Sequence, residues 1–305
     1  MGRYVVRRLL QAVIVLLGVS FLTFGIMFLA GDPAAVMVGE DWTDEQVEDF
    51  RQAMGFDQPW YVQYGRFLER AVQGDLGDSL RQNRPNLTLI VNRIPATVEL
   101  ALSALAISVL LAIPTGIISA TRRNSWLDNV FTLFALLGQS LPTFWLGILL
   151  ILIFSVTLRW TPVSGRDGLD HLILPALTLG AYSTARNARM MRSSMLEVLN
   201  QGYVQTARAK GLREFTVVGR HALRNALIPV ITLIGLEFGA LLGGAVITET
   251  IFAWPGVGRM TIQAIYGRDI PLVQASVMVL SAIFVLVNLV VDIGYTLLDP
   301  RVRLN

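Results

Sequence analysis

The chain has 305 residues, of which 53% are hydrophobic and only 15% are charged, and its formal net charge is +3. Soluble globular proteins carry about a quarter charged residues, so this composition indicates a membrane protein. The positive excess is better explained by the cytoplasmic bias of such proteins than by nucleic-acid binding. No cysteine is present, which excludes disulfides, thiolate metal sites and cysteine nucleophiles.

Spanning a bilayer takes about 20 apolar residues, and six segments reach or approach this length. They are expected at residues 9–30, 100–120, 130–158, 172–195, 226–248 and 272–291. Residues 138–142 interrupt the third segment, and the fourth is apolar only as far as Ala185. The first is longer than a signal-peptide core of about 7–15 residues, so we expect it to be retained. The sequence therefore predicts an all-α, polytopic membrane protein with six transmembrane helices.

Arginine is concentrated before the first span, after the second, in the loop after the fourth and at the C-terminal end. If the spans alternate, all these positions lie on one face, and short loops rich in arginine stay cytoplasmic. Both termini are therefore expected inside. Acidic and aromatic residues in the long outer segment predict short amphipathic helices near the membrane surface. The expected divisions are a first span with its cytoplasmic end (1–30), an outer segment (31–99), a core with five helices (100–297) and a cytoplasmic tail (298–305).

Several strongly polar side chains are expected within or at the breaks of the spans. They are Gln139, Ser140, Glu237 and Asn288. A polar group in hydrocarbon costs several kcal/mol unless it faces protein or a water-filled path. These four residues are therefore candidates for a translocation path, and interhelical hydrogen bonding is the alternative for each.

The outer end of the fifth span carries candidates of another kind. Glu249 lies where solvation is easy, so we expect a structural or a rim role for it, and Glu249 and Trp254 are candidates for an outer gate or rim. Within the same span, Gly239 and Gly243 form a Gly-x-x-x-Gly pair that allows close helix approach. This pair indicates either internal packing or contact with a second membrane subunit.

Residues 77–80 read Gly-Asp-Ser-Leu, the signature of a lipase and esterase family. That chemistry needs a histidine that activates the serine, but His171 and His221 lie far from the motif in sequence. A membrane-bound hydrolase is therefore disfavoured, and neither histidine belongs to a metal-ligand motif. Lys210 is the only lysine and is not followed by serine or threonine. The chain therefore has no Walker A loop, and any ATP must be bound by another polypeptide.

The most informative segment is residues 203–229, which is basic and too polar for the bilayer. Gly211 suits the left-handed C-terminus of a short helix, and a second helical stretch at 213–227 then leads to Pro229. The residues expected to contact a partner at this turn are Thr206, Ala207, Arg208, Ala209, Lys210, Gly211, Leu212 and Arg213. On composition alone, a solvated basic loop that only fixes topology is the favoured alternative.

This segment resembles the cytoplasmic coupling motif of ABC importer permeases, Glu-Ala-Ala-x3-Gly-x9-Ile-x-Leu-Pro. Gln205-Thr206-Ala207 stand at the first three positions, Gly211 at the glycine, and Leu227-Ile228-Pro229 close the motif several residues late. The first Glu and the first Ala are replaced. Further agreement comes from Gly31-Asp32-Pro33, Gly74-Asp75-Leu76-Gly77, residues 249–259 and Leu298-Asp299-Pro300-Arg301. The whole chain thus resembles the first permease subunit of the dipeptide, oligopeptide and nickel branch.

The resemblance implies the MetI-like fold of type I ABC importers, with an extra N-terminal helix and a long periplasmic segment, in a bacterial inner membrane. It also implies a second permease, two ATPase subunits that bind ATP and Mg, and a periplasmic binding protein. The chain itself is then no enzyme and holds no cofactor, and residues 203–229 seat in an ATPase cleft. Peptides are the expected substrates, with nickel chelate or glutathione as alternatives. A self-sufficient secondary transporter or channel is the alternative function, disfavoured because neither inverted repeats nor an intramembrane carboxylate cluster is visible.

Overall fold

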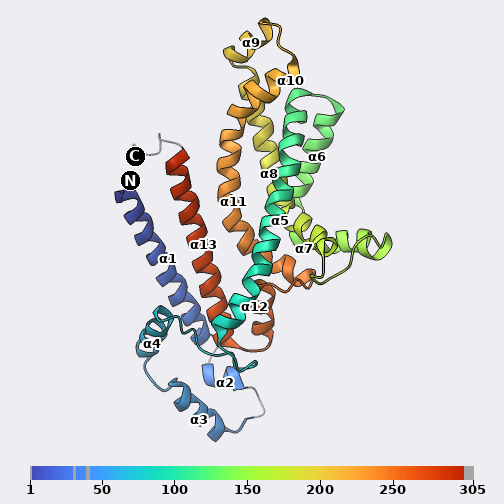
Figure 1. Cartoon of the computed structure of the whole chain (residues 1–305). Coiled ribbons are helices and arrows are strands. Elements are labelled where there is room, and N and C mark those ends of the chain that lie inside the picture. The colour runs from blue at the N-terminus through green and yellow to red at the C-terminus, as the bar shows by residue number, and fades with distance from the viewer. Residues whose placement is uncertain (1, 30–31, 39–41, 299–305) are drawn as a thin grey trace. The chain divides into compact units, whose positions relative to one another are not determined.

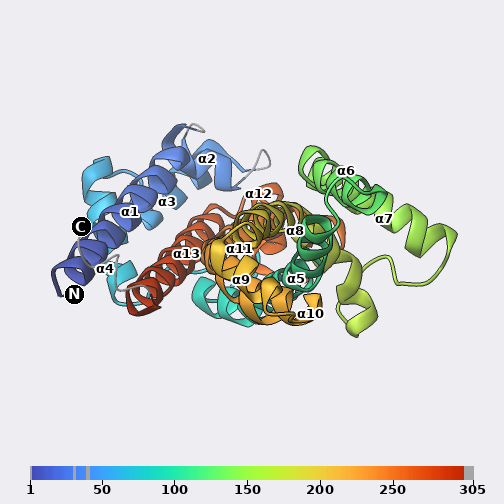
Figure 2. The same ribbon diagram turned by 90° about the horizontal axis from the view of Figure 1, so that it is seen from above.

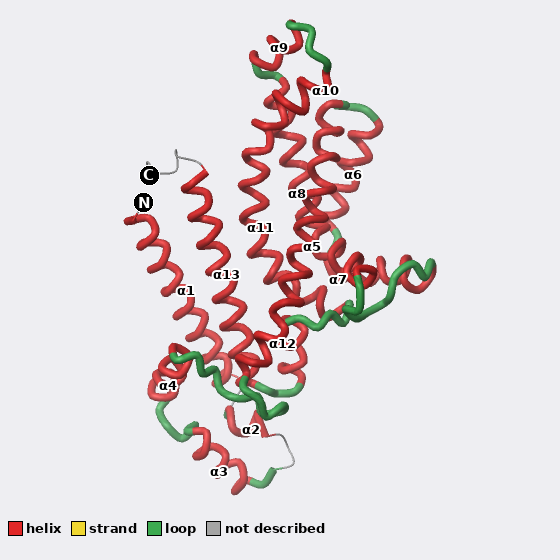
Figure 3. The backbone as a smooth tube through the Cα atoms, viewed as in Figure 1, coloured by secondary structure: helices red, strands yellow, loops and turns green. Residues whose placement is uncertain are grey.

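The computed structural model describes residues 2–29, 32–38 and 42–298, and it divides into two compact units. The first unit comprises Met1–Thr97 and Pro255–Asn305, and the second comprises Val98–Trp254. The described residues form helices joined by loops, with one isolated bridge between Asp78 and Pro85 (Figure 3). The predicted all-α class is confirmed. Gly31 and Asp299-Pro300-Arg301 lie outside the described residues.

In the first unit, helix α1 (Gly2–Leu29) packs lengthwise on α13 (Ile270–Leu298), as both views show (Figure 1, Figure 2). On α1, Leu10, Ile14 and Leu22 are 60%, 67% and 64% exposed. A helix that presents apolar side chains outward in this way is suited to contact with lipid tails.

Three short helices follow α1 within residues 31–99, the segment that the sequence predicts to lie outside: α2 (Pro33–Val38), α3 (Asp44–Met54) and α4 (Trp60–Val72). A capping box between Thr43 and Gln46 begins α3, and Gly55, in the left-handed region at φ 72°, ends it. Aromatic side chains of α1 and α4 interlock, because Phe24 lies 5.4 Å from Tyr64 and 6.1 Å from Phe67 between ring centroids. This contact fixes α4 to α1.

Helix α5 (Asn86–Thr121) runs through both units and begins well before residue 100, where the second span was expected to start. Its first turns pack in the core of the first unit against α12 (Val257–Tyr266) and α13. The backbone amide of Val257 donates to Thr97 Oγ1 at 2.9 Å. The last part of the expected outer segment is therefore the start of a long helix.

The second unit is built around α8 (Leu169–Leu199), which contacts α6 (Trp126–Ser140), α7 (Thr143–Leu150) and α11 (Leu223–Ile251). Glycine allows α5 to approach α8 closely. A Cβ atom at Gly180 would lie 2.7 Å from the carbonyl oxygen of Ala104, and one at Gly116 would meet Met191 and Ala188. These two glycines are required by the α5–α8 crossing.

Among the described residues, four helices are long and apolar enough to cross a membrane: Val6–Gly25, Asn86–Thr121, Glu214–Ile251 and Ile270–Val291. They match the first, second, fifth and sixth expected spans. The third is a bent pair, Trp126–Ser140 and Thr143–Thr157, with an angle of 113° at the predicted break. The π-helix η1 (Ile151–Thr157) continues α7. Helix α8, at the fourth position, has 31 residues but is not among these candidates, since Arg186, Arg189 and Arg192 follow its apolar part.

Candidate functional site

The basic segment forms a helical turn at one end of the second unit (Figure 1). Helix α9 (Gly202–Ala209) ends before Gly211, which has φ +76°. Helix α10 (Glu214–Thr216) then continues through the π-helix η2 (Val217–Ala222) into α11. The predicted left-handed glycine and the second helical stretch are both confirmed. We call residues 202–216 the α9–α10 turn.

Three buried side chains hold the α9–α10 turn to the helix that follows it. Val204 and Val217 are fully buried and Ala207 is 6% exposed, and they pack together with Val198 and Leu199 of α8. Ala207 was expected to contact a partner, but its burial places it beneath the turn, where only a small side chain fits between α9 and η2. The turn is thus fixed to both α8 and α11.

The other seven sequence-predicted contact residues are exposed. They are Thr206, Arg208, Ala209, Lys210, Gly211, Leu212 and Arg213. A Cβ atom at Gly211 would meet nothing within 4 Å, so the backbone of the turn is open to close approach. These seven residues lie on the exposed surface of the α9–α10 turn, and their expected contact with a partner stays a prediction.

The charges of the α9–α10 turn are not equivalent. The Arg208 guanidinium donates to both Glu214 carboxylate oxygens, at 2.6 Å and 3.2 Å. This hydrogen bond raises the pKa of Arg208 above its ordinary value. Lys210 and Arg213 form no ion pair within the described ranges. Arg208 therefore closes the turn, and the other two cations are available to an acidic partner.

Phe215 is a candidate that the sequence analysis missed. It lies one residue beyond Glu214 on the exposed side of the turn, and it is 89% exposed. Leu212, on the same turn, is 41% exposed. Exposed aromatic side chains without intramolecular packing are typical of protein interfaces. An aromatic residue within a basic loop was the signal that could have identified it.

A buried polar cluster, also missed, joins α5, α6 and α8. Asp128 of α6 is 3% exposed, and its carboxylate accepts from Arg192 Nε and Nη2 at 2.8 Å each. Ser119 of α5 donates to the same carboxylate, and the backbone amide of Asn124 does so at 3.0 Å. Since α8 leads directly into α9, this cluster fixes the helix that carries the α9–α10 turn.

The candidates for a translocation path come from both units, with Gln139, Ser140 and Glu237 in the second unit and Asn288 in the first. Gln139, at the end of α6, accepts a hydrogen bond from Arg189 of α8, and Ser140 next to it is exposed. Asn288 is half-buried on α13 and belongs to the other unit. The side chain of Gln139 is therefore engaged between helices of the second unit.

Glu237 lies at the contact between α8 and α11 and is 4% exposed. Asn187 Nδ2 donates to Glu237 Oε2 at 2.7 Å and also lies 3.2 Å from Ser108 Oγ of α5. Arg186 Nη1 is 3.9 Å from Glu237 Oε1, and no hydrogen-bond donor to that oxygen lies among the described residues. The carboxylate thus links α11 to α8, and Asn187 extends this link to α5.

Glu249 and Trp254 are both fully buried, so the expectation that Glu249 is easily solvated is wrong. The Arg166 guanidinium carbon lies 5.8 Å from the centre of a Trp254 ring, and Arg166 also donates to Glu99. The Trp254 amide donates to the Glu249 carbonyl at 2.8 Å. These residues close the end of α11 by packing and do not expose a rim.

The Gly-Asp-Ser-Leu motif has a structural role. Ser79 is 1% exposed and hydrogen-bonds to Asp269, and the Leu80 amide donates to the same carboxylate at 3.2 Å. The serine hydroxyl is therefore a buried loop anchor. This arrangement gives a substrate no access to the hydroxyl and does not support a hydrolase.

Comparison with known proteins gives two family matches. Residues 1–101 match the N-terminal model of a binding-protein-dependent transport system membrane component. Residues 112–304 match the binding-protein-dependent transport system inner membrane component.

Curated relatives match over almost their whole length. A dipeptide transport system permease protein of Alkalihalophilus pseudofirmus is 41% identical, over 98% of this chain and 99% of its own. A glutathione transport system permease protein of Escherichia coli is 44% identical, and a putative peptide transport system permease protein of Brucella abortus is 45% identical, each over 99% of both chains.

Among solved structures, an amino acid ABC transporter determined with histidines aligns with a TM-score of 0.54 at 16% identity. The alignment covers 70% of this chain and 94% of that chain. This likeness is one of fold, and it agrees with the expected importer-permease architecture.

Proposed function

Because the chain belongs to the inner-membrane components of binding-protein-dependent transport systems, we propose that it forms, together with a second permease, the path of an ATP-driven importer for di- or oligopeptides or related small solutes. The three relatives are named as permease proteins of dipeptide, glutathione and peptide transport systems. Their names support this substrate class. Nickel chelate remains the other alternative substrate. The chain acts as a membrane transport subunit without an ATPase site of its own.

The observation that carries this proposal is the α9–α10 turn. It is exposed, polar and fixed by buried contacts to two long helices, α8 and α11. In our proposal, an ATPase subunit that moved this turn would also move both helices, because Val204 and Val217 are fully buried and pack together with the end of α8. In our proposal, ATP and Mg are bound entirely by two such partner subunits.

The charge and shape of the turn support the proposed contact with an ATPase. The open backbone at Gly211 permits close contact, Phe215 and Leu212 supply apolar area, and Lys210 and Arg213 supply unpaired positive charge. An apolar centre with a charged edge is the usual anatomy of a protein interface. We therefore propose an apolar cleft with an acidic rim as the partner surface.

The turn must face the cytoplasm for an ATPase to reach it. In our proposal the chain lies in a bacterial inner membrane with both termini inside, and a periplasmic binding protein delivers solute to the outer segment. The second permease would contact α11, where Ala240 and Gly243 are exposed and a Cβ atom at Gly243 would meet nothing within 4 Å. Small residues permit close helix packing between subunits.

Reconstitution tests the proposal. Proteoliposomes that contain this chain, the second permease, the ATPases and the binding protein should concentrate a dipeptide only with ATP. Proteoliposomes with this chain alone should not concentrate it, with or without a proton or sodium gradient. Accumulation by the chain alone would identify a secondary transporter instead, and equilibration without accumulation would identify a channel.

A further inference from the structure

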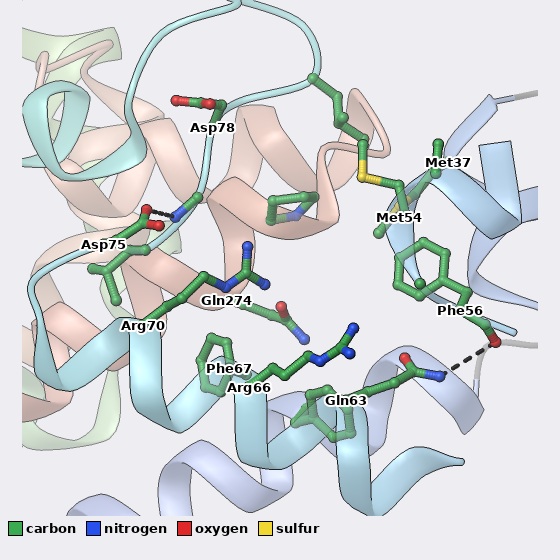
Figure 4. A pocket seen from close by; sticks show the side chains of 17 residues that line it. Met37, Met54, Phe56, Gln63, Arg66, Phe67, Arg70, Asp75, Asp78 and Gln274 are labelled. Atoms are coloured by element: carbon green, nitrogen blue, oxygen red, sulfur yellow. Dashed lines mark hydrogen bonds between the residues drawn. The ribbon is translucent and has the colours of Figure 1, made fainter. Parts of the chain in front are cut away.

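A cavity of about 360 Å³ lies within the first unit, between the outer helices and the start of α13 (Figure 4). Small-molecule pockets typically have volumes of about 300–1,000 Å³. Both charged and apolar side chains line the cavity, and all of them belong to the same unit. The α9–α10 turn, in contrast, belongs to the second unit.

Two arginines enter the cavity from α4. Arg66 and Arg70 are one helical turn apart, so their side chains share a face, and both reach into the cavity (Figure 4). Neither forms an ion pair or a side-chain hydrogen bond in the part of the chain that the structure describes. Two unpaired guanidinium groups beside one cavity provide the donor geometry that binds a carboxylate.

Two carboxylates line the same cavity from the loop after α4. Asp75 accepts a hydrogen bond from the Gly77 amide at 2.8 Å, and Asp78 has no ion-pair partner within the described ranges. Neither carboxylate is within ion-pair distance of Arg66 or Arg70. The cavity therefore carries two positive and two negative groups that are not neutralised by each other.

The loop that carries these carboxylates is fixed in place. Asp269 binds Ser79 and the Leu80 amide, Arg81 Nε donates to the Gly267 carbonyl at 2.8 Å, and Asn86 Nδ2 donates to the Leu76 carbonyl at 3.0 Å. Groups held in advance lose little freedom when a ligand binds. The loop backbone on the acidic side of the cavity is therefore preorganised, and the Gly77 amide orients the Asp75 carboxylate.

Apolar side chains form much of the remaining lining, beside the amides of Gln63 and Gln274. Met37, Met54, Phe56 and Phe67 face the cavity (Figure 4). Thioether side chains are flexible and polarisable, so they adapt to different apolar groups. The cavity thus combines charged groups of both signs with a surface that tolerates varied side chains.

We propose that this cavity binds a short zwitterionic peptide, with the peptide carboxylate on Arg66 and Arg70 and the peptide ammonium on Asp75 and Asp78. A simple anion would pair with the arginines and be repelled by the carboxylates, whereas a zwitterion satisfies both. The proposal rests on the proposed function, because import would bring peptides to the outer segment.

Binding of alanyl-leucine to the assembled importer in nanodiscs, without the binding protein and without ATP, tests this site. Calorimetry should detect saturable binding, and the C-terminal amide and the N-acetyl derivative should each bind about tenfold more weakly. Arg66→Gln with Arg70→Gln should weaken binding of the free dipeptide about tenfold and leave the amide unchanged. Asp75→Asn with Asp78→Asn should also weaken binding of the free dipeptide about tenfold, and it should leave the affinity for the N-acetyl derivative unchanged. Arg84→Gln, an exposed arginine outside the lining, is the matched control.

The site would be overturned if the importer bound the dipeptide and its amide with equal affinity. It would also be overturned if neither double variant changed the affinity for the dipeptide. Uptake of the same dipeptide by the complete importer with its binding protein separates the two proposals. Uptake without such binding leaves the proposed function standing and removes the cavity site. Absence of uptake for every peptide, with a properly assembled and ATP-hydrolysing importer, removes the proposed function itself.

Discussion

Asp128 of α6 and Arg192 of α8 form a two-pronged ion pair, with Nε and Nη2 each 2.8 Å from a carboxylate oxygen. The carboxylate is nearly completely buried, and the guanidinium is partly exposed. Removing one partner from such a pair leaves an uncompensated charge, which costs more than the pair itself contributes. The pair therefore matters for the stability of the helix that leads into the α9–α10 turn.

We expect Arg192→Met to lower the free energy of unfolding by about 3 kcal/mol, because Asp128 stays buried without its cation. Methionine keeps the apolar stem, so the loss is electrostatic. Denaturant unfolding in detergent micelles measures it. Adding Asp128→Asn should recover more than half of the loss, since Ser119 and the Asn124 amide can still bond to the new side chain. Arg123→Met, an exposed arginine in the adjacent loop, is the control. Equal losses in the single and the double variant would show that the charge is not the cause.

Gly211→Arg should uncouple ATP hydrolysis from uptake while leaving membrane insertion intact. The new side chain meets no atom of this chain, so its bulk is directed at whatever approaches the turn. The measurement is the ratio of ATP hydrolysed to dipeptide taken up by the reconstituted importer. Gly211→Ala carries the same left-handed strain, about 1 kcal/mol, without the bulk, and should retain most coupling. Full coupling in Gly211→Arg would rule out the turn as the ATPase contact.

Phe215→Ala should weaken binding of the ATPase subunits at least about tenfold without changing the unfolding temperature of the chain. Its ring is 89% exposed and so contributes little to folding, whereas buried aromatic anchors dominate interface energies. Co-purification of the ATPases at graded concentrations gives the affinity. Tyr266→Ala removes another aromatic ring, 86% exposed at the end of α12, and should leave the affinity unchanged. A Phe215→Ala complex of normal affinity would remove Phe215 from the interface.

The sequence predicted the features that depend on composition and local backbone geometry. Apolar length locates the helices, and the break at residues 138–142 becomes a bend of 113°. Gly211 adopts the left-handed conformation expected of it, because only glycine does so without strain. Each of these follows from residues that are neighbours in the chain.

Features that depend on contacts between distant residues were not predictable in this way. Asp128 and Arg192 are 64 positions apart, and nothing local indicates their pairing. Glu249 was placed in solvent because of its position along the span, yet neighbouring elements bury it completely. The cavity beside Arg66 needs residues from α1, α4 and α13 together. Pairings of this kind arise only when the helices pack.

Glu237→Gln separates the two interpretations of the buried carboxylate. Glutamine keeps an acceptor for Asn187 Nδ2, which lies 2.7 Å from Glu237 Oε2, so assembly and unfolding temperature should stay close to those of the parent chain. We expect uptake to fall severalfold, because Arg186, 3.9 Å from the other oxygen, loses its counter-charge at the α8–α11 contact. Glu237→Ala should in addition lower stability by about 1–3 kcal/mol, since the Asn187 amide loses its acceptor. Initial uptake rates in proteoliposomes, normalised to assembled complex, are the measurement. Normal rates in Glu237→Gln together with a destabilised Glu237→Ala would assign this residue to helix packing and remove it from the translocation path.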